Sequence, residues 1–207
     1  MRSLMFAATL LVAPAWCTAV SATEASPPTA SVTECDRLAG HPSDPDKVVA
    51  GVSQSEVLSW PEAATRSCEL AVSRDPANAR VRYQLGRVLF YTGRHADALP
   101  HLEASAAARH RQAQFVLGLL YTDGVPGVLE PDACRAAALW RDAASRGHFA
   151  ARVALGRDYV RGRYDACDEA PMKEDVAGYL EAAAAEARDY YQRLLISWAR
   201  EALAARP

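Results

Sequence analysis

The chain has 207 residues, of which half are hydrophobic and 8% are aromatic, and its formal net charge is −2. This hydrophobic content excludes extensive disorder away from the ends, and the balanced charge gives no support for nucleic acid or an anionic membrane surface as a partner. Much of the apolar content is alanine, which favours closely packed helices over a β-rich core. We therefore expect an all-α fold.

Residues 1–22 predict a secretory signal peptide. Arg2 precedes an apolar stretch from Leu4 to Trp16, and small residues at Val20 and Ala22 fit cleavage after Ala22. The alternative is a retained membrane anchor, but the stretch is shorter than the ~20 residues that cross a bilayer. No later apolar run approaches that length, so we expect no stable membrane span after cleavage and a periplasmic or secreted protein.

Four cysteines remain after cleavage, and an even number in an oxidising compartment predicts two disulfides. No two of them form the CxxC spacing typical of a metal site. We predict pairing between neighbours in the sequence, although three connectivities are possible and four buried thiols are the alternative. Each such bridge stabilises the fold by roughly 3–4 kcal/mol in the chain-entropy model. The cysteines are Cys35, Cys68, Cys134 and Cys167.

Two segments follow the signal peptide. Residues 23–58 are expected to form an N-terminal leader that is partly flexible, because its first residues are small, polar and rich in proline. Residues 59–207 show helical patterning and are expected to form a helical-repeat domain. Its last stretch, Tyr190 to Ala204, mixes apolar and charged residues, which is typical of a terminal capping helix.

The first long helix of this domain has clear predicted ends. Ser59 is expected to cap it, with Glu62 completing a capping box three residues later. Asp75-Pro76 is expected to end it.

Three later places in the chain share a leucine-glycine pair, which marks equivalent first helices of repeated helix pairs. Glycine in a helix is useful where a neighbouring helix approaches closely, so we expect the three glycines to face Ala98, Ala137 and Ala177. Trp140 is expected to fill the gap between units. His110 and His148 fall in the same register between units, which favours a structural role over catalysis. The leucine-glycine pairs are Leu85-Gly86, Leu117-Gly118 and Leu155-Gly156, and the equivalent second-helix positions are Leu102, Trp140 and Leu180.

Residues 113–151 resemble a Sel-one-like repeat, a relative of the tetratricopeptide repeat, at the leucine-glycine pair, Tyr121, Asp132, Trp140 and Gly147. Residues 151–187 are a poorer copy, and residues 80–106 are closer to the tetratricopeptide form. Residues 35–52 look like the lead-in of some exported bacterial proteins of this group. The resemblance implies an α-solenoid of stacked helix-turn-helix repeats over residues 60 to 205. In that frame Cys134 lies at the start of one second helix and Cys167 in the inter-helix loop of the following unit. Neighbouring units stack their loops along one edge, where the two sulfurs can meet.

The resemblance also implies a binding face, because tetratricopeptide-type stacks bind peptides along their first helices. Arginines beside aromatic residues would suit a peptide with an acidic group, since guanidinium forms forked hydrogen bonds to carboxylate. The alternative is that the arginines only solvate an exposed helix face. The expected binding residues are Arg80, Tyr83, Arg87, Phe90, Gln112, Phe115, Leu119 and Arg157.

No GxSxG, HExxH or phosphate-binding loop occurs, so we predict no catalytic residues, no metal, no cofactor and no enzymatic activity. The resemblance implies an exported adaptor or regulator that binds a protein or peptide on its concave face, such as an envelope sensor or a scaffold component. Two alternatives remain open. One is a cell-wall-related hydrolase or β-lactam-binding protein of cysteine-rich repeat type, and the other is a structural subunit of an envelope assembly.

Overall fold

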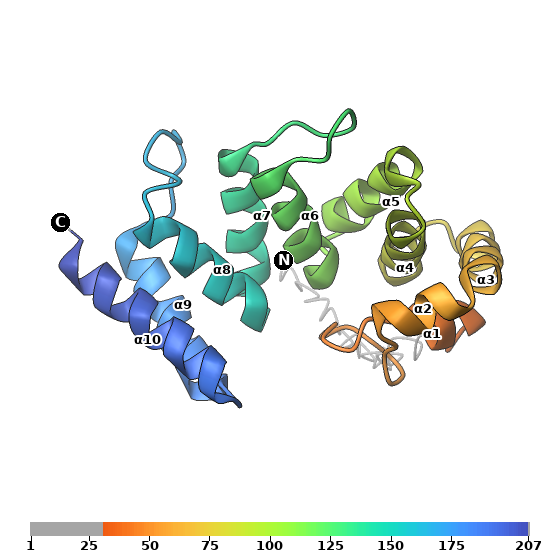
Figure 1. The fold of residues 1–207 in the computed structure, drawn as a ribbon, viewed down its shortest axis with the longest axis horizontal. Coiled ribbons are helices and arrows are strands. Elements are labelled where there is room, and N and C mark those ends of the chain that lie inside the picture. The colour runs from red at the N-terminus through yellow and green to blue at the C-terminus, as the bar shows by residue number, and fades with distance from the viewer. Residues whose placement is uncertain (1–30, 207) are drawn as a thin grey trace, which may run out of the picture. The chain divides into compact units, whose positions relative to one another are not determined.

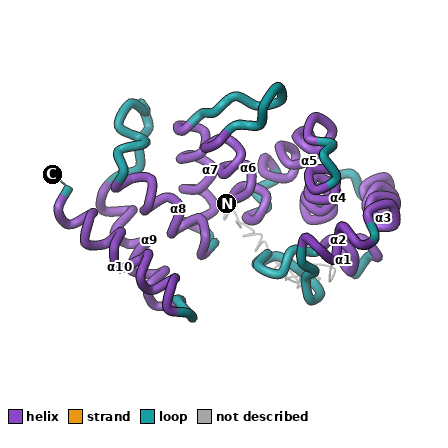
Figure 2. Tube along the Cα trace, in the orientation of Figure 1, coloured by secondary structure: helices purple, strands orange, loops and turns teal. Residues whose placement is uncertain are grey.

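The computed structural model describes residues 31–206, and in this range the chain is all-α (Figures 1 and 2). The described range holds no strand, only one isolated antiparallel bridge between Val125 and Leu129. The predicted all-α fold class is therefore confirmed. The predicted signal peptide, residues 1–22, lies outside the described residues. The helices are α1 (Glu34–Ala39), α2 (Gln54–Ser59), α3 (Pro61–Arg74), α4 (Ala79–Tyr91), α5 (His95–Ala107), α6 (Arg111–Asp123), α7 (Ala133–Ser145), α8 (Phe149–Val160), α9 (Lys173–Glu186) and α10 (Tyr190–Ala205).

The two short N-terminal helices begin with capping boxes. Thr33 accepts from the backbone of Asp36 at the start of α1, and Ser53 accepts from Glu56 at the start of α2. The cap expected at Ser59 is wrong, because Ser59 is the last residue of α2 and α3 begins at Pro61. Proline suits the first position of a helix, where its missing N–H group has no partner to lose.

Residues 32–207 form one compact unit, so residue 59 is not a boundary between units. Helix α1 packs against α3 and α4, and α2 packs against the same two helices. The leader expected to be partly flexible is thus folded from residue 34 onward. Its residues contribute Cys35, Ala39 and Val57 to the first cluster of the hydrophobic core.

From α3 to α10 each helix packs against the next helix in the chain, as Figure 1 shows. The core is a series of apolar clusters between successive helices. This arrangement agrees with the repeated helix pairs expected from the leucine-glycine pattern. None of the described helices combines the length and apolar character needed to cross a membrane.

The three repeat glycines lie where helices approach closely, as predicted, but the atoms nearest to each glycine belong to the large second-helix residue rather than to the predicted alanine. A Cβ atom on Gly86 would lie 2.8 Å from Leu102, and one on Gly156 would lie 2.6 Å from Leu180. The nearest atoms to Gly118 belong to Trp140. The glycines therefore receive the large second-helix residues, and Ala98 contributes only its backbone oxygen, 3.3 Å from the built Cβ of Gly86. Trp140 packs within its own helix pair as well as against α8.

Both predicted disulfides are present. Cys35–Cys68 joins α1 to α3, with the Cα atoms 4.6 Å apart. Cys134–Cys167 joins the start of α7 to the loop between α8 and α9, with the Cα atoms 5.5 Å apart. Two disulfides are typical of a protein that folds in an oxidising environment.

Candidate peptide-binding face

Three of the four residues of α4 that were expected to line an open binding face are buried. The exposed fractions of Arg80, Tyr83 and Arg87 are 7%, 1% and 4%. Arg80 and Arg87 are bonded to residues 33–52 of the same chain, here called the N-terminal segment. Tyr83 packs with Leu102 and Leu117 and stacks on His110. The interpretation of these three residues as an open lining is therefore corrected: the chain itself occupies this part of the face.

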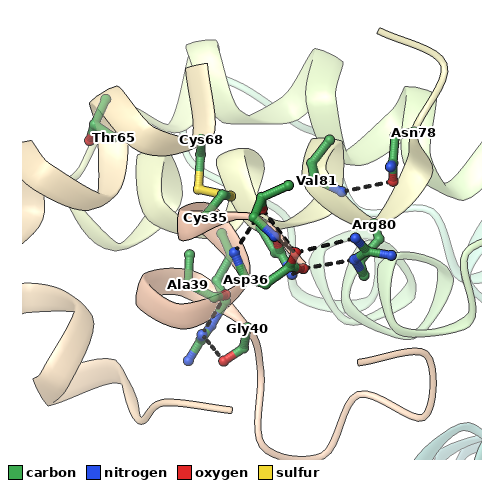
Figure 3. Close-up of a disulfide and its surroundings, with 12 residues drawn as sticks. Cys35, Asp36, Ala39, Gly40, Thr65, Cys68, Asn78, Arg80 and Val81 are labelled. Atoms are coloured by element: carbon green, nitrogen blue, oxygen red, sulfur yellow. Dashed lines mark hydrogen bonds and ion pairs between the residues drawn. A yellow bond between two sulfur atoms is a disulfide. The ribbon is translucent and has the colours of Figure 1, made fainter. Parts of the chain in front are cut away.

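Asp36 of the N-terminal segment receives the arginine contact that was expected for a foreign acidic group (Figure 3). Arg80 Nε donates to Asp36 Oδ1 over 2.7 Å, and Arg80 Nη2 donates to Oδ2 over 3.2 Å. Gln84 and Thr33 also donate to this carboxylate. Burial alone raises the pKa of Asp36, but the hydrogen bonds from Arg80, Thr33 and Gln84 hold the pKa below its usual value. Asp36 is therefore ionised at neutral pH.

Arg87 binds the backbone of the N-terminal segment at two places. Its Nη1 donates to the carbonyl oxygens of Ala39 and Gly40, over 2.9 and 3.0 Å, where α1 ends. Its Nη2 donates to the carbonyl oxygen of Val52 over 2.7 Å. A single guanidinium thus joins both ends of the loop between α1 and α2, and its charge also favours the negative end of the α1 dipole.

A buried acid–histidine contact lies at the middle of the N-terminal segment. Asp44 Oδ2 lies 3.4 Å from His110 Nε2, and neither atom has a hydrogen-bond partner among the described residues. Burial raises the pKa of Asp44 to about 6 and lowers the pKa of His110 to about 4. Beside this pair Arg111 Nη2 contacts Asp46 Oδ1 at 2.5 Å. At neutral pH Asp44 is therefore ionised and His110 is neutral.

The cluster of Asp44, Asp46 and His110 offers three ligand atoms within 4.8 Å of one another, but its chemistry does not favour a metal ion. His110 Nδ1 accepts the backbone N–H of Ala113 at the start of α6, so in the neutral ring the proton is on Nε2. A metal would need the lone pair of Nε2, and metal-binding histidines almost always donate through the other nitrogen. Arg111 already neutralises Asp46. The cluster is better suited to holding the N-terminal segment.

His148 repeats the role of His110 one helix pair later. Its Nδ1 accepts the backbone N–H of Ala151 over 3.1 Å at the start of α8, and its Nε2 lies 2.9 Å from Gln112 Oε1. The same tautomer argument makes Nε2 the donor to Gln112. The shared register of the two histidines thus reflects a shared structural role, in which each ring caps one helix and contacts a neighbouring segment.

Beyond the N-terminal segment the face remains open as a hollow of about 630 Å³. It lies between α4, α6, the start of α8, and residues 41–45 of the N-terminal segment. Four expected binding residues meet there: Phe90, Gln112, Phe115 and Leu119. Sequence reasoning missed the other principal lining residues, which are His41, Ser43, Pro45, Tyr91, Val116, Leu120 and Phe149.

The hollow is mainly apolar. Phe115 stacks on His148 with ring centroids 4.9 Å apart, and Phe90 stacks on His95 at 4.4 Å. These stacks fix the orientation of the two rings, so the lining is preformed. Polar groups come from Glu186, Gln192 and Ser43. No arginine among residues 31–206 lines the hollow.

Arg157 lies apart from the hollow, in contrast to the expectation. Its Nε donates to Asp158 Oδ1 over 2.6 Å, and its guanidinium lies 6.0 Å from the centre of the Trp140 ring. Asp158 is buried and is also within ion-pair distance of Arg161 and Arg163. Arg157 therefore balances a buried carboxylate.

Comparison of the chain with protein-family models, with curated proteins and with solved structures found no match. Its function therefore has to be inferred from the occupied and open parts of this face.

Proposed function

We propose that the chain is an exported α-solenoid of the Sel-one-like and tetratricopeptide-like type, which binds a peptide segment of another protein in the hollow. One observation carries this proposal: the same face already binds a peptide segment, residues 33–52 of the chain itself. Side chains of α4 hold that segment through both a carboxylate and backbone carbonyls. The two disulfides support export to an oxidising compartment such as the bacterial periplasm.

The lining of the hollow indicates what kind of segment it would bind. The arginines expected to read an acidic group are used internally, so the open part favours an apolar side chain. Its volume lies in the range of known ligand sites, which are mostly apolar with a few polar groups. Burying one aromatic side chain there removes ~150–250 Å² from water, a gross gain of about 4–6 kcal/mol. Association costs consume a large part of this gain, so we expect a reversible complex.

Site-specific photocrosslinking tests the proposal. A photoreactive residue replaces Leu119 inside the hollow, and in a matched control it replaces Leu70, which is exposed on α3 and does not line the hollow. We expect a crosslinked protein from intact periplasm at position 119 and none at position 70. Leu119→Glu should then abolish binding of the identified partner, whereas Leu70→Glu should leave it unchanged. Equal crosslinking at both positions would contradict the proposal.

The hydrolase or β-lactam-binding alternative requires a nucleophile activated by a base. Ser43 and His41 both line the hollow, but His41 Nδ1 accepts the backbone N–H of Ser43 over 3.0 Å. That bond occupies one of the two ring nitrogens that could act as the base. Labelling by a fluorescent penicillin that disappeared in Ser43→Ala would favour this alternative over peptide binding. The structural-subunit alternative would be favoured if the partner bound away from the hollow.

A further inference from the structure

Helix α10 is apolar on two opposite faces. One face is buried against α8 and α9 through Ile196, Ala199 and Leu203. The other face exposes five large apolar side chains, here called the α10 stripe. Their exposed fractions are 65% for Tyr190, 79% for Tyr191, 53% for Leu194, 37% for Leu195 and 41% for Trp198.

A helix-packing seam runs through the α10 stripe. Three of its members, Tyr191, Leu195 and Trp198, are followed by Ala202 and Ala205 at alternating steps of four and three residues. Such steps keep side chains on one side of a helix, where a second helix can pack. A terminal capping helix normally has a polar outer face. The seam on the outer face of α10 therefore lacks a partner helix within residues 31–206.

We propose that a second copy of this chain covers the α10 stripe, with the two α10 helices antiparallel about a two-fold axis between Leu194 and Leu195. In this arrangement Tyr191 lies level with Trp198 of the second copy, and Leu194 lies level with the second copy's Leu195. An interface of this symmetry must be complementary to itself. The α10 stripe meets that requirement, because large rings face large rings and leucine faces leucine.

Charge complementarity selects the antiparallel orientation. Arg188 precedes α10 and Glu201 lies near its end, and both are exposed without an ion pair among the described residues. Antiparallel packing places Arg188 level with Glu201 of the second copy, at each end of the seam. Parallel packing would place like charges together, which is unfavourable. Arg161 and Arg200 are occupied by Trp198 and Glu181 respectively, so they do not disturb this pairing.

The exposed area sets the expected strength. Taking ~200 Å² for a fully exposed aromatic residue and somewhat less for leucine, the α10 stripe exposes about 500 Å² per copy. Two copies would bury about 1,000 Å² in total, which is the lower limit for specific interfaces. We therefore expect a reversible dimer with a dissociation constant in the micromolar range.

Sedimentation velocity across the micromolar range, on protein purified from the periplasm, tests this proposal. The unmodified protein should shift from monomer to dimer as its concentration rises, and Leu194→Glu should weaken dimerisation at least tenfold. Leu70→Glu is the matched control, because Leu70 is similarly exposed on α3. Circular dichroism should show unchanged melting for both variants, since both side chains are at the surface.

A charge exchange tests the orientation separately. Arg188→Glu alone and Glu201→Arg alone should each weaken the dimer, whereas the double exchange should restore it. A monomer throughout the concentration range would overturn the proposal, as would capture of α10 by a different protein with no self-association. Failure of the double exchange to restore dimerisation would overturn the antiparallel arrangement.

Discussion

The ion pair between Asp36 and Arg80 should make an unusually large contribution to stability for a single carboxylate. Asp36→Asn removes the charge but keeps the size of the side chain. It leaves the guanidinium of Arg80 buried without its counter-ion, and it places an amide N–H₂ group where Thr33 and Arg80 now donate. Breaking a buried pair in this way costs about 3–5 kcal/mol.

Urea unfolding followed by tryptophan fluorescence measures this cost. With a typical denaturant dependence of ~2 kcal/mol per molar urea, the unfolding midpoint should fall by about 2 M. Glu56→Gln is the matched control, because Glu56 makes the equivalent capping-box contact at the exposed start of α2. Its unfolding midpoint should change little, since exposed pairs are weak.

A double-mutant cycle separates the ion pair from the packing around it. Asp36→Leu and Arg80→Leu should each be strongly destabilising, because each leaves one buried charge. The double variant should recover much of the loss, since replacing both partners by apolar groups removes the unpaired charge. If Asp36→Asn shifted the midpoint no more than Glu56→Gln, the account of how α4 holds the N-terminal segment would be refuted.

Three further predictions concern the packing, the histidines and the disulfides. Gly118→Ala should destabilise the fold, because the new methyl group would meet the Trp140 ring. Gly178→Ala in α9 should stabilise the fold by up to ~1 kcal/mol, since no atom lies within 4 Å of the new Cβ. Thermal melts of the two variants test this difference. The free energy of unfolding should fall as the pH drops from 6.5 to 4, because burial lowers the pKa of His41, His110 and His148 to about 4 and these rings take up protons more readily when unfolded. Asp44, with its pKa raised to about 6, opposes this trend below pH 6, so a stability that rose on acidification would contradict the assignment of the histidines as the dominant groups. Replacing Cys35 and Cys68 by serine should lower stability by about 3–4 kcal/mol and should reduce amide protection in residues 33–52. The same change at Cys134 and Cys167 should leave that protection intact, which hydrogen exchange measures.

The helix pairs could be predicted from the sequence because their signals are local and repeated. In each of the three leucine-glycine pairs the glycine leaves space for a large residue of the next helix, so the repeated pair indicates the same packing in all three helix pairs. The prediction that Gly86 faces Ala98 identified the approaching helix, because the Ala98 carbonyl oxygen lies 3.3 Å from the built Cβ, but sequence register does not say which side chain fills the space. Leu102, one turn further along α5, fills it. The prediction that Ser59 caps the first long helix was wrong. It relied on the capping-box pattern of Ser59 and Glu62, whereas Pro61 favours the first position of a helix and α3 begins there.

The binding face was only partly predictable for a different reason. The chemistry expected of Arg80, a forked contact with a carboxylate, is present, but the carboxylate is that of Asp36 in the same chain. The pattern of a helix indicates which residues share a face, not which segment covers that face. One signal was available: the predicted bridge between Cys35 and Cys68 ties Asp36 close to the first long helix. Arg87 gave no such signal, because its partners are backbone carbonyls.

The occupied and open parts of the face depend on each other. Residues 41–45 of the N-terminal segment form one wall of the hollow, and Arg87 and Arg111 hold that segment in place. Removing the segment would enlarge the hollow and would also expose Arg80 and Arg87, changing its preference from apolar to acidic ligands. We therefore propose that the N-terminal segment determines which partner the face binds, and we expect Arg87→Met to alter partner selection even though Arg87 itself is buried.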